Sequence, residues 1–210
     1  MFKKAILALV LAAALAADHY YPDAALKDVT DEPVQWVTGD GKKSAILMQD
    51  GAKPVEMRVA ALITRVRLEY GADNGAVNAA LAAKALDGTI VEPGGIFSFN
   101  AVVGPRTASR GYVEGASIMQ TEEGLALVPD VGGGVCRTAT ALHMAVQAAG
   151  LEVVEHHSHG LPVGYARPGE DAAVAWLDLD YRFRNTKERA VMIKATPGKD
   201  CCEIEIWKVF

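Results

Sequence analysis

The residues best suited to chemistry are a cysteine that follows three glycines and a cluster of histidines further along the chain. Gly132-Gly133-Gly134-Val135-Cys136 leads into an apolar, helix-like stretch that runs to Gly150. This pattern predicts a tight turn that leads into a helix, with the Cys136 thiol at or near the helix N-terminus. Free backbone N–H groups and the positive end of the helix dipole favour a thiolate there. We therefore interpret Cys136 as a candidate nucleophile; the alternative is a small buried hydrophobic residue, because free cysteines commonly pack that way.

The histidine cluster, Glu155-His156-His157-Ser158-His159, supplies the candidate bases. If the strand expected to lead into the cluster stays extended, His157 and His159 point to one side and His156 to the other. One member of the pair would then accept the proton of the Cys136 thiol, and the other would bind substrate.

Asp171 follows a Pro-Gly pair, and it would either orient an imidazole as the third member of a triad or cap a loop. Two other interpretations of the histidine pair stay open. The two imidazoles can form a hydrogen-bonded structural pair, or they can bind zinc together with Cys136 or Asp171. The triad needs no cofactor, so zinc is the minor alternative.

Polar residues in two further stretches are candidates for binding the substrate. Arg106 lies in a Gly-Pro loop, and its guanidinium can bind a carboxylate through two parallel hydrogen bonds. The backbone N–H groups of Gly133 and Gly134 would hold an oxyanion. Asn100 is instead expected to bond loop backbone. The other candidate substrate-binding residues are Ser98, Tyr112 and Arg137.

The composition favours one exported globular domain. Half of the 210 residues are apolar, which allows a sizeable core, and a net charge of -5 without any basic run makes nucleic acid a poor partner. Residues 1–17 combine a basic start, an apolar run and small residues before a cleavage point, as in a secretory signal peptide. The run is too short to span a bilayer, so we expect a mature chain in the periplasm or at the cell surface, without a membrane anchor. The three cysteines leave at least one free thiol.

The rest of the chain divides into a leader with a possible hairpin at 18–55 and a single domain at 56–210. The alanine-rich stretch from Asn74 to Leu86 predicts a helix with apolar residues four apart on one face and Asn78 facing water. Alternating and β-branched stretches toward the C-terminus predict antiparallel strands at 172–176, 179–183, 190–194 and 203–207. Trp176 is expected in the core. Helices early and mid-chain with strands at the end indicate an α+β fold, in which a few helices pack on a mainly antiparallel sheet.

Several separate blocks of the sequence resemble the VanW family and occur in the family's order, between about Thr64 and Lys194. They are Pro93 to Asn100, Gly104 to Thr107, Gly111-Tyr112, Gly132 to Cys136, Ala149 to Glu155, His157 with His159, and Pro168 to Ala172. The resemblance implies an exported or membrane-tethered protein in a cell-wall context. The chain departs from the family pattern around its candidate site, at Arg137, Ala139, His143 and His156.

The order of the elements is also similar to that of transglutaminase-like and papain-like thiol hydrolases, although fold analogy does not fix function. The sequence thus supports three hypotheses. The first is an exported thiol-dependent hydrolase or acyltransferase that acts on peptidoglycan peptides. The second is a non-enzymatic cell-wall binding module that uses the same pocket, and the third is a zinc site.

Overall fold

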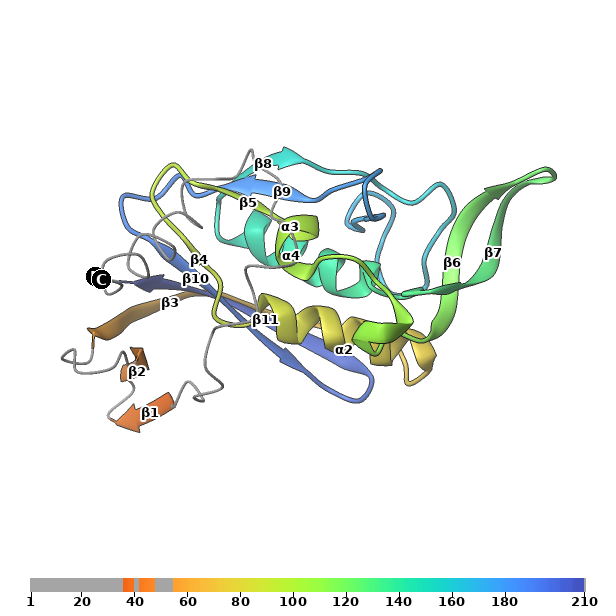
Figure 1. Ribbon diagram of the computed structural model, residues 1–210. Helices are drawn as coiled ribbons and strands as arrows, with labels where there is room; N and C mark the ends of the chain where they lie inside the picture. The colour runs from red at the N-terminus through yellow and green to blue at the C-terminus, as the bar shows by residue number, and fades with distance from the viewer. Residues whose placement is uncertain (1–35, 40–41, 48–54, 210) are drawn as a thin grey trace, which may run out of the picture.

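The main layer of the protein is an antiparallel six-stranded sheet, seen in a computed structural model that describes residues 36–39, 42–47 and 55–209 (Figure 1). The expected signal peptide at 1–17 lies outside these residues. The order of the strands across the sheet is β1 (Trp36–Gly39), β2 (Lys42–Leu47), β3 (Val55–Glu69), β11 (Cys201–Val209), β10 (Val191–Pro197) and β4 (Ile90–Val91). Strands β1 and β2 form the hairpin that was expected in the N-terminal stretch.

Two helices cover one face of this sheet (Figure 1). Helix α2 (Asn74–Leu86) contacts β10, and helix α4 (Cys136–Ala148) contacts β3 and β11. Both helices begin and end where the sequence indicated, since Gly88 and Gly150 follow their last turns with positive φ. Buried aliphatic side chains from the helices and from β10 and β11 form one continuous core. The expected α+β class is confirmed.

A second, three-stranded sheet lies over the other side of α4. Its strand order is β5 (Ile96–Ser98), β9 (Arg182–Arg184) and β8 (Glu152–Glu155). A short helix, α3 (Phe99–Val103), follows β5 directly. Phe97 of β5 stacks on Phe183 of β9, with ring centroids 4.9 Å apart. Helix α4 therefore runs between two sheets.

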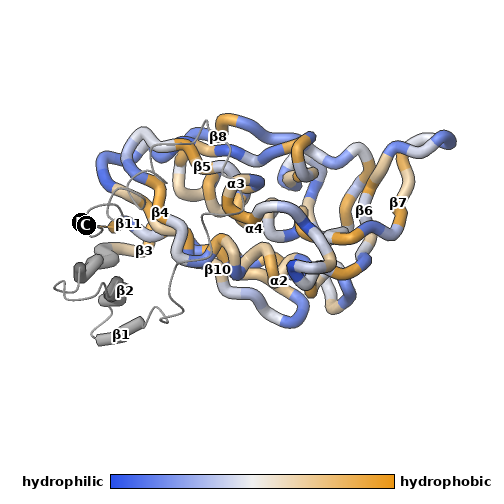
Figure 2. Tube along the Cα trace, in the orientation of Figure 1, coloured by the Kyte–Doolittle hydropathy of each residue, from blue (hydrophilic) through white to orange (hydrophobic). Residues whose placement is uncertain are grey.

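An antiparallel hairpin of β6 (Glu114–Thr121) and β7 (Gly124–Val131) projects from this layered body (Figure 1). Figure 2 shows hydrophilic residues at its tip and more hydrophobic residues along its arms. The base of the hairpin joins Tyr112 to the glycine turn before Cys136. The hairpin thus connects two of the blocks that were singled out in the sequence. No helix among the described residues is long and apolar enough to cross a membrane.

Helix α2 presents a different face to the core than expected. Asn78 is fully buried, whereas Val77 is 48% exposed. The buried face is made mainly of alanines, including Ala79, Ala82 and Ala83. Small side chains let the helix approach its neighbours closely, and of the expected apolar face only Leu81 and Ala85 pack, partly buried, against the core. The expectation that Asn78 faces water was wrong.

Three further expectations fail near the site. The strand β8 ends at Glu155, so His157 and His159 lie in a loop and not on a continuing strand. The stretch that was expected to form a strand at 172–176 contributes only a bridge between Ala175 and Leu179. Trp176 follows this bridge residue and is 39% exposed, so it is not a core residue.

Candidate active site

Each of the three glycines before Cys136 lies against a different neighbour. A Cβ atom on Gly132 would come within 2.6 Å of the Cβ atom of Arg106. On Gly133 it would lie 2.3 Å from the backbone oxygen of Gly115, and on Gly134 it would lie 2.4 Å from the Cα atom of Gly75. Because two of these contacts are with backbone, no rotamer change could relieve them. The triple glycine therefore allows α2, the β6–β7 hairpin and the turn to pack together.

The buried amide of Asn78 holds this turn in place. Its Nδ2 atom donates to the backbone oxygens of Gly133 and Val113, at 2.8 Å each. Its Oδ1 atom accepts from the N–H of Val113 at 2.9 Å. Asn78 thus connects α2, the base of the hairpin and the glycine turn with a satisfied set of hydrogen bonds.

Cys136 is the first residue of α4, as the sequence predicted, and its side chain is partly buried. The sulfur accepts from the N–H of Val174 at 3.4 Å and lies 3.5 Å from the carbonyl oxygen of Val174. The thiol also interacts with the side chain of His159, because Cys136 is among the groups that raise the pKa of this imidazole. The thiol therefore sits between a helix N-terminus, an imidazole and the chain segment that follows Asp171.

His159 is held on its other side by Asp171. The Nδ1 atom of His159 lies 2.6 Å from the Oδ2 atom of Asp171, which also accepts from the backbone N–H of His159 at 2.7 Å. An ionised carboxylate only accepts hydrogen bonds, so Nδ1 carries a proton and Nε2 is the nitrogen left for the thiol. The two side chains are 9% and 6% exposed.

This burial sets the protonation of the pair. Burial alone would lower the pKa of His159, but hydrogen bonds and charge interactions with Cys136 and Asp171 outweigh it and raise the pKa. Burial would likewise raise the pKa of Asp171, but the two hydrogen bonds from His159 lower it. Asp171 therefore favours the protonated, positively charged form of the His159 imidazole.

Two contacts fix the segment that carries Asp171 against α4. The N–H of Ala172 donates to the hydroxyl of Thr140 at 2.9 Å, one turn beyond Cys136. The N–H of Ala173 donates to the backbone oxygen of His157 at 2.7 Å. The histidine loop and the Asp171 segment are thus held side by side next to the start of α4.

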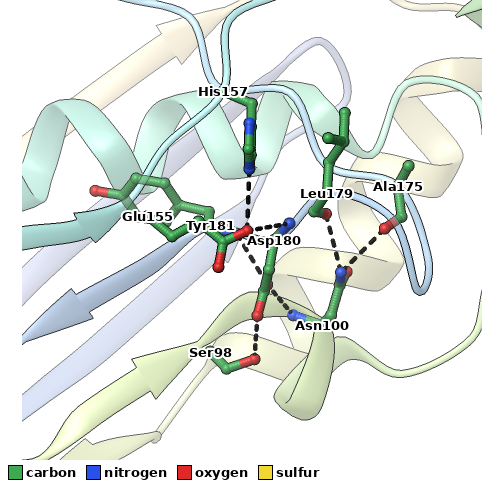
Figure 3. Close-up of polar contacts among 8 residues, drawn as sticks. All are labelled: Ser98, Asn100, Glu155, His157, Ala175, Leu179, Asp180 and Tyr181. Carbon is green, nitrogen blue, oxygen red and sulfur yellow. Dashed lines mark hydrogen bonds and ion pairs between the residues drawn. The ribbon is translucent and has the colours of Figure 1, made fainter.

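His157 belongs to a separate network, which Figure 3 shows. Its Nε2 atom donates to the Oε1 atom of Glu155 at 3.0 Å, and Glu155 also accepts from the N–H of Asp180 at 3.1 Å. Asp180 in turn accepts from the hydroxyl of Ser98 at 2.5 Å and from the N–H of Asn100 at 2.8 Å (Figure 3). His157 and Ser98 are therefore placed in a structural network, away from the thiol's hydrogen bonds.

Asn100 completes this network as the sequence predicted. Its Nδ2 atom donates to the carbonyl oxygens of Ala175 and Leu179, at 3.0 Å each (Figure 3). These bonds close the small loop that presents Trp176. Asn100 thus ties loop backbone together and shapes the edge of the site.

His156 packs against the segment that carries Asp171. Its ring stacks on His143, with centroids 4.2 Å apart, and its Nε2 atom donates to the backbone oxygen of Asp171 at 2.8 Å. His143 lies 3.2 Å from the hydroxyl of Tyr181 and is buried. Burial and the neighbouring His156 lower the pKa of His143 to about 4. A stacked histidine pair, of which the buried His143 favours the neutral form, therefore lies against the residue that orients His159.

Arg137, a candidate for substrate binding, is engaged in the protein. Its guanidinium binds the carboxylate of Asp73, with nitrogen–oxygen distances of 2.5 and 2.7 Å. The same group lies over the rings of Tyr70 and Tyr165, 5.2 and 6.0 Å from their centroids. The ion pair joins the N-cap residue of α2 to the first turn of α4.

The two other candidate substrate-binding residues differ sharply. Tyr112 is 4% exposed and packs in the core, where burial raises its pKa. Arg106 has both terminal nitrogens buried without a hydrogen-bond partner among the described residues. Of these candidates, Arg106 is therefore the one whose guanidinium is available to bind a substrate group.

The expected oxyanion donors need revision. The N–H of Gly133 donates to the backbone oxygen of Asp130 at 3.0 Å, so it is committed to the turn. Within residues 55–209, the N–H groups of Gly134 and Cys136 have no such acceptor. The first N–H groups of a helix lack intrahelical partners, and the N–H of Cys136 is therefore the better donor for a developing negative charge.

Three residues at the site were not anticipated from the sequence. Val174 contacts the sulfur through its backbone, Trp176 lies over Arg106, and Tyr165 packs its ring edge against His159 at 6.5 Å. A contact made by backbone atoms, such as that of Val174, does not depend on the type of residue and so cannot be recognised in the sequence. Of the three, only Trp176 could have been assigned to the site from the sequence, because it closely follows the segment that begins at Asp171. Within the described residues, no group of three His, Cys, Asp or Glu side chains is placed to hold a metal ion.

Comparison with known proteins adds the family. Residues 74–207 match the family described as VanW like protein. The chain is also 42% identical, over 118 residues, to the uncharacterized protein YoaR of Bacillus subtilis (strain 168). That alignment covers 56% of this chain and 38% of the relative's own length. No solved structure gives a significant match, and the expected likeness to transglutaminase-like and papain-like hydrolases stays a prediction. The matched region contains both large helices and every residue of the site, and the chain therefore belongs to the VanW-like family, which suggests a cell-wall-associated protein.

Proposed function

We propose that this protein is a thiol-dependent hydrolase or acyltransferase that acts on peptide bonds of peptidoglycan or of its peptide precursors. The observation that carries the proposal is the series of Cys136, His159 and Asp171 at the start of α4, in which Asp171 bonds Nδ1 of His159 and the thiol interacts with the same imidazole. Such a series is the arrangement that activates a cysteine nucleophile.

The chemistry follows from the order of these contacts. His159 accepts the proton of the Cys136 thiol, and the thiolate attacks the acyl carbon of the substrate. Asp171 holds the neutral imidazole in the tautomer with the proton on Nδ1 and stabilises the imidazolium that forms. The N–H of Cys136 stabilises the oxyanion of the tetrahedral intermediate. As the carbon–nitrogen bond breaks, His159 returns the proton to the leaving amine, and water or another amine then takes the acyl group from the sulfur.

The choice of substrate rests on the family and on the sequence. Membership of the VanW-like family favours a cell-wall context. The basic and apolar stretch at 1–17 favours export to the periplasm or cell surface. The partner in this proposal is peptidoglycan or its peptides, with no role for nucleic acid and no membrane anchor after cleavage of the signal.

The test is turnover of a soluble muropeptide digest, followed by mass spectrometry, with wild-type protein and three variants. Cys136→Ser and His159→Ala should each reduce product formation at least 100-fold. His157→Ala is the matched control, since its ring bonds Glu155 and not the thiol, and it should retain activity within about threefold.

Two outcomes would overturn the proposal. Equal product from wild type and Cys136→Ser would remove the thiol from the reaction. Binding of muropeptides by both proteins, with no product from either, would instead support a non-enzymatic binding module that uses the same pocket.

A further inference from the structure

The guanidinium of Arg106 is a buried positive group without a hydrogen-bonded partner. Neither of its terminal nitrogens is solvent-exposed or bonded to any described residue. The Cζ atom of Arg106 lies 5.6 Å from the centroid of the Phe99 ring and 5.7 Å from the centroid of the Trp176 ring. Two aromatic rings offset only part of the lost hydration. The site thus holds a guanidinium whose terminal N–H groups are not paired with any described residue.

The acids of the site accept hydrogen bonds from other groups, and Asp180 acts on Arg106 only through its charge. Asp180 accepts from Ser98 and from backbone N–H groups, Asp171 accepts from His159, and Glu155 accepts from His157. Arg137 illustrates the contrast, because it has the same side chain but is paired with Asp73. The missing partner of Arg106 is therefore not a described carboxylate of this chain.

Arg106 lies between two segments, one of which leads to the Cys136 thiol while the other contacts it. The stem of Arg106 packs against Gly132, four residues before Cys136. Its guanidinium lies by Trp176, two residues after the Val174 backbone that contacts the sulfur. The charge of Arg106 also interacts with the thiol group of Cys136. The guanidinium and the thiol are therefore neighbours at the site.

We propose that Arg106 is a specificity residue that binds a carboxylate of the substrate next to the acyl carbon attacked by Cys136. This inference rests on the proposed function and deepens it, since it selects acidic peptides as the substrate class. The planar guanidinium offers two parallel N–H groups that match the two oxygens of a carboxylate. Trp176, which is partly exposed, would cover one side of the bound substrate carboxylate. A neutral substrate would leave the buried charge unpaired and would bind less well.

The test compares two alkylating reagents of nearly equal size. Iodoacetate carries a carboxylate beside the carbon that sulfur attacks, whereas iodoacetamide carries a neutral amide at the same place. The ratio of their rates at Cys136 reports the preference for a carboxylate, and the iodoacetamide rate corrects for any change in thiol reactivity. No turnover is needed, so failure of the proposed catalytic activity does not affect this measurement.

The ratio of the iodoacetate rate to the iodoacetamide rate should be about tenfold higher for Cys136 of the wild-type protein than for N-acetylcysteine. Arg106→Met should abolish the excess, and Arg106→Lys, which keeps the charge but not the paired donors, should keep part of it. Arg167→Met removes an exposed positive charge and should change the ratio less than twofold. Cys136→Ser should take up no label, because Cys201 and Cys202 are buried.

Two results would overturn the inference. A wild-type ratio equal to that of N-acetylcysteine would do so even if the Arg106 variants failed to fold. An Arg106→Met protein that folds, by its circular dichroism spectrum, and keeps the wild-type ratio would show that another group selects the carboxylate.

Discussion

The Nδ2 atom of Asn78 donates a hydrogen bond of 2.8 Å to the backbone oxygen of Gly133, in the middle of the glycine turn before Cys136. The donor lies on α2 and the acceptor precedes α4, so a single buried amide sets how the two helices meet. The same side chain also binds both backbone groups of Val113 at the base of the hairpin. The start of α4 is thus positioned by a residue far from it in sequence.

Replacing Asn78 by alanine should be costly. The substitution removes three hydrogen bonds, each of which contributes on the order of 1 kcal/mol. It leaves the N–H of Val113 and the carbonyl oxygen of Gly133 without a partner among the described residues, while the carbonyl oxygen of Val113 still accepts from the N–H of Gly132. We expect Asn78→Ala to reduce the free energy of unfolding by about 3 kcal/mol, measured by urea denaturation. Val77→Ala, next to it on the exposed side of α2, should change this free energy by less than about 0.5 kcal/mol. Similar losses in both variants would contradict the role given to the amide.

Two glycines with positive φ provide a test of the close packing around the turn. Gly134 has φ +99° and would place a Cβ atom against the backbone of Gly75, whereas Gly94 has φ +75° and open space around it. Gly94→Ala should cost only the backbone strain, about 1 to 2 kcal/mol. Gly134→Ala should cost about 4 kcal/mol or more, because backbone must also move. Urea denaturation of both variants measures the difference, and equal costs would mean that packing at the turn has no part in stability.

The elements that dominate the site could be predicted from local sequence. The glycines, the apolar run after Cys136 and Gly150 define a turn, a helix and its end, and each of these signals depends on neighbouring residues. The thiol at a helix start was therefore predictable. The same holds for α2, whose alanine content and N-terminal Asp73 specify a helix without reference to its surroundings.

The pairing of residues across the site could not be predicted in this way. His157 and His159 seemed equivalent on an extended strand, but β8 stops at Glu155 and the loop turns them to different partners. Asn78 looked like a surface residue, because its buried role depends on an acceptor 55 positions away. The free state of Arg106 and the paired state of Arg137 likewise depend on which acids the fold brings near. Local periodicity carries no information on such long-range contacts.

The buried His143 should make the protein sensitive to acid. The pKa of His143 is about 4 in the folded chain, below the value of 6.5 for an unperturbed histidine. Between these values the unfolded state binds a proton that the native state does not, so stability falls as the pH is lowered. The loss can reach about 3 kcal/mol below pH 4, at about 1.4 kcal/mol for each pH step.

A phenylalanine at this position keeps a ring against His156 but cannot be protonated. His143→Phe should therefore lose less stability than the wild type between pH 6.5 and pH 4. Urea denaturation at several pH values measures this, and the difference between the two proteins removes the contribution of carboxylates that titrate in the same range. Parallel curves for the two proteins would show that His143 is not the acid-sensitive group.

Asp171 should control the reactivity of Cys136 through His159, although it does not touch the sulfur. Asp171→Asn keeps a hydrogen-bond acceptor near Nδ1 but removes the charge that stabilises the imidazolium. The imidazolium–thiolate pair should then form less readily, and alkylation by iodoacetamide at neutral pH should slow about tenfold or more. Glu155→Gln makes the equivalent change beside His157, and it should leave the rate within about twofold, because that network does not bond the thiol. If both variants slowed alkylation equally, the two histidines would share the task, and the assignment of His159 as the single base would be wrong.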